Sequence, residues 1–235
     1  MNRHVTAGLL IAAAVCTNVA FTVLGMVFDY PDVLKKPVDE ILTDFRASQA
    51  AVMAWFAVLA LSAALFAPIA IGVGRLSSRP SMRLAVPVGI AAAVVQFVGL
   101  ARWVVLVPGF ASDATSADPA VAAGARDSFV LAHRILGNLV GETLGYIFTA
   151  AWTLLVLVAL GRTIAGRWFT VLGAISAVLV LSGVLSPLNL PGVDLANFIG
   201  YVLWSFWLLA FAVLLLRGPR EAAPTDQKLS NARTR

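Results

Sequence analysis

The sequence predicts an all-α membrane protein with six transmembrane helices. Of its 235 residues, 60% are hydrophobic and only 12% are charged, and the mean hydropathy is +0.90. An ordinary soluble domain is about 45–50% apolar and about 25% charged. This chain therefore lacks the polar surface that a soluble globule needs. The composition excludes a secreted soluble domain, a disordered chain and a coiled coil.

Six apolar runs are each about 20 residues long, which is enough to cross a bilayer. Such runs must be helical, because lipid offers the backbone no hydrogen-bond partners. We assign residues 1–217 to one transmembrane domain and residues 218–235 to a disordered cytoplasmic tail. The six spans are 5–28, 48–73, 84–107, 135–160, 168–188 and 195–216.

The first run, Val5–Phe28, follows Arg3 and superficially resembles a signal peptide. It is longer than the 7–15-residue apolar region that is usual in signal peptides. A lipoprotein cleavage site is also a poor fit, because Val15 stands directly before the single cysteine, Cys16. We therefore expect an uncleaved first span.

The connections between spans differ in character. The loop Asp29–Ala47 carries apolar residues at helical spacing, which predicts a short amphipathic helix lying on the membrane: Val38, Ile41, Leu42 and Phe45. Pro108–Ala125 is rich in Ala, Ser and Asp and predicts a flexible connection. Asn189–Asp194 predicts a tight Pro-Gly turn.

The charged residues predict the orientation. Eleven basic residues gather at one end of the spans: Arg3, Arg75, Arg79, Arg83, Arg162, Arg167, Arg217, Arg220, Lys228, Arg233 and Arg235. The opposite loops hold only Lys35, Lys36, Arg46 and Arg126, together with nine acidic residues. Cytoplasmic loops carry the excess of Lys and Arg, so both termini are expected in the cytoplasm. An even number of spans independently requires both termini on one side.

A possible internal repeat links the last four spans. Five residues recur at an offset of 55, namely Gly145, Tyr146, Trp152, Leu154 and Arg162 as Gly200, Tyr201, Trp207, Leu209 and Arg217. In the preceding spans, Gly89 and Gly99 are ten residues apart, as are Gly173 and Gly183. The pattern predicts a duplicated helical hairpin, although these residue types are also common at the ends of membrane helices.

Polar residues inside the spans are the main functional pointers. Arg134, Asn138 and Glu142 are spaced four residues apart in the fourth span and form one stripe, with His133 about 100° away from it on a helical wheel. Gly137, Gly141 and Gly145 flank this stripe and would let another helix approach closely. Arg102, near the outer end of the third span, could pair with Asp127 or Glu142.

We therefore predict an outward-facing polar pocket. Arginine and histidine suit an anionic head group, and a glutamate suits a cation or a proton. The predicted ligand-binding residues are Glu142, Arg134, Asn138, Arg102, His133, Asn18, Asn197 and Tyr201. The alternative is a polar network that only fixes helix packing, with Arg102, His133 and Arg134 reaching the outer interface.

We assign no catalytic residue, no metal ligand and no cofactor. The two histidines, His4 and His133, lie near opposite membrane faces and cannot share a haem. One cysteine forms neither a disulfide nor a Cys-rich metal site. Walker, HExxH and GxSxG patterns are absent, so whether the chain is an enzyme stays open, with a non-enzyme favoured.

Two segments resemble a known family. These are Leu136-Gly137-x3-Gly141-Glu142-x2-Gly145-Tyr146-x5-Trp152-Thr153 and Asn197-x2-Gly200-Tyr201-x2-Trp204-x2-Trp207-Leu208-Leu209. They are similar to a group of six-helix integral membrane proteins, common in actinobacteria, that is catalogued as a domain of unknown function. The resemblance implies one domain in a bacterial cytoplasmic membrane and no particular mechanism.

The sequence thus predicts a multi-pass membrane protein that binds or transports a small solute or lipid through the outward-facing pocket. Two alternatives stay open, an intramembrane enzyme acting on a lipid head group and a structural or accessory subunit. The expected partners are membrane lipids and the ligand itself, and small-residue helix faces would permit a homodimer or a partner subunit. Nucleic acid is not expected, because the basic residues lie at helix ends.

Overall fold

The structure is a computed structural model that describes residues 2–164, 166–188 and 190–217, without the side chains of residues 161–163. The predicted tail, 218–235, lies outside the described residues. Throughout the described part of the chain, the secondary structure is helical and contains no strand. Six helical segments are long and apolar enough to cross a membrane, which confirms the predicted fold class.

The six segments each contain one to three helices. In order they are α1 (Arg3–Phe28); α3 (Gln49–Ala64) with α4 (Phe66–Gly74); α5 (Pro80–Val105) with α6 (Val107–Asp113); α7 (Pro119–Ala132), η2 (His133–Leu144) and α8 (Gly145–Ile164); α9 (Gly166–Ser182) with η3 (Gly183–Leu188); and α10 (Val193–Arg217). Between the first two segments lie η1 (Asp32–Lys35) and α2 (Val38–Ala47).

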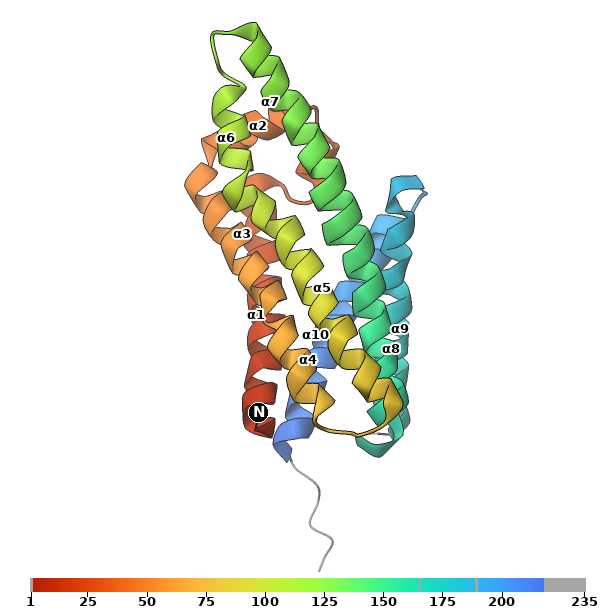
Figure 1. Cartoon of the computed structure of the whole chain (residues 1–235). Coiled ribbons are helices and arrows are strands. Elements are labelled where there is room, and N and C mark those ends of the chain that lie inside the picture. Colours follow the sequence, from red (N-terminus) through yellow and green to blue (C-terminus); the bar gives the residue numbers. More distant parts are fainter. Residues whose placement is uncertain (1, 165, 189, 218–235) are drawn as a thin grey trace, which may run out of the picture.

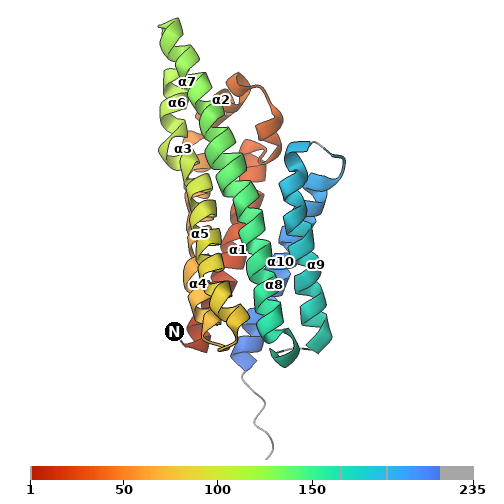
Figure 2. The same cartoon turned by 45° about the vertical axis from the view of Figure 1, so that its right-hand side comes forward.

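Segments that follow one another along the chain also lie side by side, and α1 packs against α10 to close the bundle. Figures 1 and 2 show the start of α1 and the end of α10 at the same end of the molecule, as an even number of crossings requires. We call this the inner end. The outer end carries α2, α6 and the start of α7.

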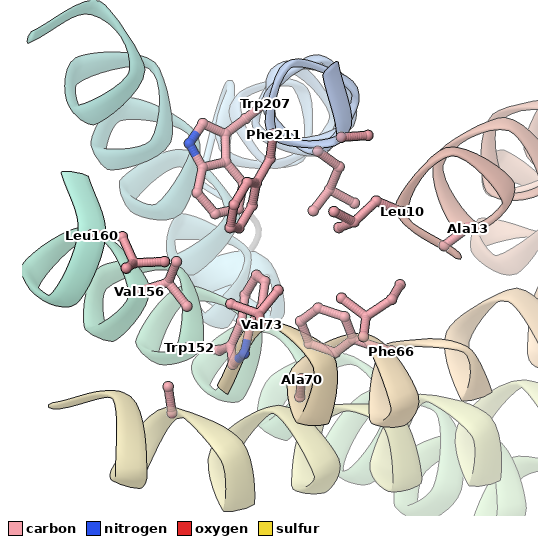
Figure 3. Packing of buried hydrophobic residues seen from close by; sticks show 14 of the residues in the cluster. Leu10, Ala13, Phe66, Ala70, Val73, Trp152, Val156, Leu160, Trp207 and Phe211 are labelled. Carbon is pink, nitrogen blue, oxygen red and sulfur yellow. The ribbon is translucent and has the colours of Figure 1, made fainter. Parts of the chain in front are cut away.

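The inner half of the bundle is filled by a large apolar core (Figure 3). Trp152 lies at its centre, with ring centroids 4.6 Å from Phe66 and 5.9 Å from Trp207. Phe169 stacks on the other side of Trp207 at 5.1 Å. These fully buried aromatic rings come from α4, α8, α9 and α10, so they seal the inner half against water.

Glycines place matching contacts in the two predicted hairpins. A Cβ atom built on Gly89 would lie 2.6 Å from Trp152 Cδ1, and one on Gly173 would lie 2.7 Å from Trp207 Nε1. Higher in each hairpin, Gly145 lies against Gln96 of α5, and Gly200 lies against Val180 of α9. The second hairpin therefore repeats the glycine contacts of the first hairpin at equivalent positions in both of its helices. This supports the predicted duplication.

The outer connection between α5 and α7 differs from the prediction. The expectation that Pro108–Ala125 is a flexible connection is wrong, because most of it forms the helical hairpin α6–α7, which projects beyond the other helices (Figures 1 and 2). Asp118 starts α7 by accepting a hydrogen bond from the Ala120 backbone at 2.8 Å, and Pro119 suits the first helical position. These local capping signals outweigh the loop-like composition.

The predicted amphipathic helix exists as α2, but its apolar face does not lie on lipid. Ile41, Leu42 and Phe45 are fully buried in a second core at the outer end, together with Phe56 and Trp103. We call Asp29–Ala47, which contains η1 and α2, the cap segment. It is fastened to the outer ends of the helices by burial of this apolar face.

The crossing of α5 and η2 yields the first prediction. A Cβ atom on Gly99 would lie 2.5 Å from Gly141 Cα, so Gly99→Ala must push the two backbones apart. We expect a loss of about 1–3 kcal/mol in the free energy of unfolding, measured by denaturant titration in micelles. The control is Gly124→Ala in α7, where nothing lies within 4 Å. Equal stability of the two variants would contradict the close crossing.

Candidate functional site

The fourth helical segment changes its helix type where the sequence predicts the polar stripe. Residues His133–Leu144 form a π-helix, η2, between α7 and α8. Its hydrogen bonds span five residues instead of four, so residues four or five apart share one face. His133, Asn138 and Glu142 therefore lie along one face, whereas in an α-helix His133 and Glu142 would be about 180° apart. The π-helix therefore changes the membership of the predicted stripe. His133 joins Asn138 and Glu142, and Arg134 is exposed.

Arg102 of α5 lies against this face of η2 and is only 5% exposed. Its Nη1 donates to the Gly99 carbonyl, and its Nη2 donates to His133 Nδ1 at 3.3 Å. A guanidinium only donates, so His133 Nδ1 must carry no proton in this contact. Room for the guanidinium exists because Gly137 has no side chain, since a Cβ there would lie 2.8 Å from Nη2.

The predicted ion pairs of Arg102 are not formed at contact distance. Among the described residues, no carboxylate oxygen lies within 4 Å of its guanidinium. Glu142 is close enough to interact with Arg102 electrostatically without touching it. The guanidinium also lies 5.3 Å from the centroid of the Trp103 ring. The buried positive charge of Arg102 is thus contacted by neutral groups, and the Glu142 side chain does not touch it.

Glu142 is half-buried, and its side chain has no hydrogen bond or ion pair with any residue that the structure describes. The chain contains three tyrosines, and all three lie within electrostatic range of this carboxylate: Tyr30, Tyr146 and Tyr201. The rings of Tyr146 and Tyr201 are 5.9 Å apart between centroids. Each of these side chains is only partly buried, so the group retains some accessible surface.

Tyr30 reaches this group from the cap segment, and the sequence analysis did not identify it. Its ring packs 5.1 Å from Phe56 and 5.5 Å from Phe21. Burial raises the pKa of the Tyr30 hydroxyl well above its usual value, Glu142 raises it further, and Arg102 opposes the rise. Tyr30 therefore keeps its proton and offers an O–H donor. The available signal was compositional, because a chain with only three tyrosines places all of them here.

We call Tyr30, Arg102, His133, Glu142, Tyr146 and Tyr201 the outer cluster. Hydrogen bonds between helices form a belt on its inner side. Gln96 Nε2 donates to Thr149 Oγ1 at 3.0 Å, and Trp204 Nε1 donates to Thr153 Oγ1 at 2.9 Å. Thr149 and Thr153, the acceptors in the belt, are fully buried on α8 on either side of Trp152 of the apolar core.

Two further predicted residues, Asn18 and Asn197, form side-chain hydrogen bonds between helices. Asn18 Nδ2 donates to Ser205 Oγ at 2.9 Å and so joins α1 to α10. Asn197 Nδ2 donates to the Val180 carbonyl at 2.7 Å, beside Tyr146 at Gly183. Four predicted residues thus meet in the outer cluster, while Asn18 and Asn197 lie next to it. The ligand-binding role of all eight residues stays a prediction.

The cap segment covers this region and carries exposed ion pairs. Lys35 Nζ lies 2.9 Å from Asp32 and 3.6 Å from Asp194 at the start of α10. Lys36 bridges Asp29 and Asp44, at 3.2 Å each. The hydrogen bonds with these carboxylates raise the pKa of both lysines. Exposed pairs of this kind contribute little stability, so they orient the segment more than they hold it.

Two surface hollows are lined by residues outside the outer cluster. One, of about 370 Å³, lies between the ends of α1 and α2 and includes Asp29 and Asp44. The other, of about 300 Å³, lies at the inner end beside Arg3 and Arg75. In the part of the chain that the structure describes, no three His, Cys, Asp or Glu side chains are grouped to hold a metal ion.

Residues 5–212 match the model of a family described as a domain of unknown function, DUF4386. The chain belongs to the DUF4386 family. This confirms the resemblance to an uncharacterised domain family, and the match includes every residue of the outer cluster. The chain has no significant match among curated proteins or solved structures.

The separation of Arg102 and Glu142 yields the second prediction. Each single change, Arg102→Met or Glu142→Leu, leaves the other charge inside the membrane with less compensation, and we expect a loss of about 3 kcal/mol in each case. The double variant should lose at least about 1 kcal/mol less than the sum, measured by unfolding in mixed micelles. Additive losses would show that the two charges do not stabilise one another.

Proposed function

We propose that this DUF4386 protein is a multi-pass protein of the bacterial cytoplasmic membrane, with both termini in the cytoplasm, that binds a small solute or lipid head group at the outer cluster. The observation that carries the proposal is Glu142, a membrane carboxylate without a hydrogen-bond or ion-pair partner among the described residues. Charged groups inside membranes are costly, and those that persist normally serve a site or pair with one another. Here Arg102 and Glu142 face the same region without touching, as a site for a third group requires.

The π-helix supports the same interpretation. Extended π-helical structure is rare, and π segments occur frequently at functional sites. In this chain η2 brings His133 and Glu142 to one face, which a regular α-helix would not do. A helix that served packing alone would have no need of this arrangement.

The direction of access follows from the two halves of the bundle. The inner half is closed by the Trp152 and Trp207 core, whereas the polar side chains of the outer cluster lie in the outer half beside a second apolar core. A ligand would therefore reach the outer cluster from the outer side. The polar side chains of α1, α5, α8 and α10 also bond to one another. This favours a binding protein over an accessory subunit whose polar stripes face a partner helix.

The proposed orientation leads to the third prediction. Green fluorescent protein fused after Arg217 should fluoresce, because this reporter folds in the cytoplasm, and alkaline phosphatase fused there should be inactive. Alkaline phosphatase inserted between Ser116 and Ala117, at the tip of the α6–α7 hairpin, should be active. The reverse pattern would place the outer cluster at the cytoplasmic face and overturn the orientation.

The fourth prediction concerns access to the cluster. In a Cys16→Ser background, a cysteine at Asn138, on the His133 and Glu142 face, should react with a membrane-impermeant thiol reagent added outside cells. A cysteine at Thr153, a fully buried residue of the belt, is the control and should stay unmodified. The proposal fails if the Asn138→Cys variant is inert from outside, or if Thr153→Cys reacts equally fast.

A further inference from the structure

The carboxylate and tyrosine rings of the outer cluster have the composition of a site for an organic cation. Glu142 supplies an acidic side chain that is negative when ionised, and the rings of Tyr146 and Tyr201 lie 5.9 Å apart at 58° to one another. Tyr30 adds a third ring from the cap segment. Aromatic faces attract ammonium groups within about 6 Å, most strongly where water is excluded. Calcium and magnesium instead require several oxygen ligands together, and here one carboxylate stands among aromatic rings.

Arg102 gives the same site a place for an anionic group. The contacts with Gly99 and His133 use two of its five N–H groups, and the others have no partner among the described residues. The guanidinium lies beside Gly137, about one turn of η2 before Glu142. Its planar set of donors matches a carboxylate or phosphate group. The Tyr30 hydroxyl lies within electrostatic range of both Arg102 and Glu142.

The charge balance of the cluster decides between ligand classes. An ionised Glu142 balances the charge of Arg102, and the proton-free His133 Nδ1 in contact with Arg102 adds none, so the cluster with Glu142 ionised is neutral overall. A lone anion or a lone cation would leave a net charge in a poorly hydrated environment, which is costly. A molecule with one positive and one negative group satisfies both side chains and leaves no net charge.

We infer that the outer cluster binds a small zwitterion that carries an ammonium group, with the ammonium at Glu142 and the tyrosine rings and the anionic group at Arg102. This inference rests on the proposed binding function and narrows its ligand. Both a free solute and a lipid head group can carry an ammonium group together with an anionic group. Titrations in two lipid compositions distinguish the free solute from the lipid.

The test uses the full chain in nanodiscs of phosphatidylglycerol, titrated with glycine betaine in a calorimeter. We expect saturable binding by the unmodified protein. Glu142→Gln should weaken this binding at least about tenfold. The matched control is Glu40→Gln, which removes an exposed outer carboxylate away from the cluster and should leave the affinity unchanged.

A second set of variants does not depend on the folding of the Glu142 variant. Tyr201→Leu removes one ring and should weaken betaine binding about tenfold, while Tyr201→Phe keeps the ring and should stay within about threefold. Phe198→Leu, which removes an exposed ring of the same helix, is the control and should bind as the unmodified protein does. Equal affinities for Tyr201→Leu and Tyr201→Phe would overturn the aromatic part of the site.

The source of the ligand is identified by repeating the titration in nanodiscs that contain phosphatidylethanolamine. A lower apparent affinity for betaine there identifies the lipid head group as the competing ligand, and an unchanged affinity identifies a free solute. Both results support the inferred chemistry.

The inference and the proposed function fail in distinguishable ways. If acetate alone or tetramethylammonium alone binds as tightly as betaine, or if none of the three binds, the zwitterion class is wrong. The binding site would still stand if Asn138→Cys remains reactive from outside. If this cysteine is inert, both the inference and the proposed function are overturned.

Discussion

The crossing of α5 with η2 is the constraint on which the outer half of the bundle depends. Gly99 and Gly141 bring the two backbones together, and only at this spacing can Arg102 lie beneath Gly137 and donate to His133. A guanidinium inside a membrane protein is costly unless polar groups of the protein contact it. The neutral acceptors on either side hold it in place, and this leaves its charge available to the neighbouring Glu142.

The two hairpins of the internal repeat share their helix-packing contacts but differ in their polar residues. The contacts of Gly89 with Trp152 and of Gly145 with Gln96 are reproduced in the second hairpin by Gly173 with Trp207 and Gly200 with Val180. At the repeat-equivalent positions, however, Gln96 corresponds to Val180 and Glu142 corresponds to Asn197. The side-chain amide of Asn197 donates a hydrogen bond to the Val180 carbonyl. The second hairpin therefore keeps the helix contacts and lacks the charge, which places the polar site on the first.

Hydropathy and residue spacing predicted the six segments and most of their ends, because each bilayer crossing requires about 20 consecutive apolar residues. They do not reveal η2, because the polarity pattern does not distinguish α- from π-helical hydrogen bonding. The predicted stripe therefore contains Arg134 and leaves out His133. The α6–α7 hairpin was missed for a related reason, because alanine-rich helices and loops have similar compositions. Tyr30 was missed because its position depends on how the cap segment folds back over the bundle.

The cap segment itself shows which forces keep the outer cluster covered. Its ion pairs at Lys35 and Lys36 are mostly exposed to solvent and are screened by salt. The burial of Ile41, Leu42 and Phe45 against Phe56 and Trp103 is complete, and each such side chain contributes about 1.5–3 kcal/mol. Apolar packing therefore fixes the cap, and Tyr30 is held within electrostatic range of Glu142 by the same core that contains Trp103, the neighbour of Arg102. The apolar residues of the outer core that exclude water therefore also orient the polar groups of the outer cluster.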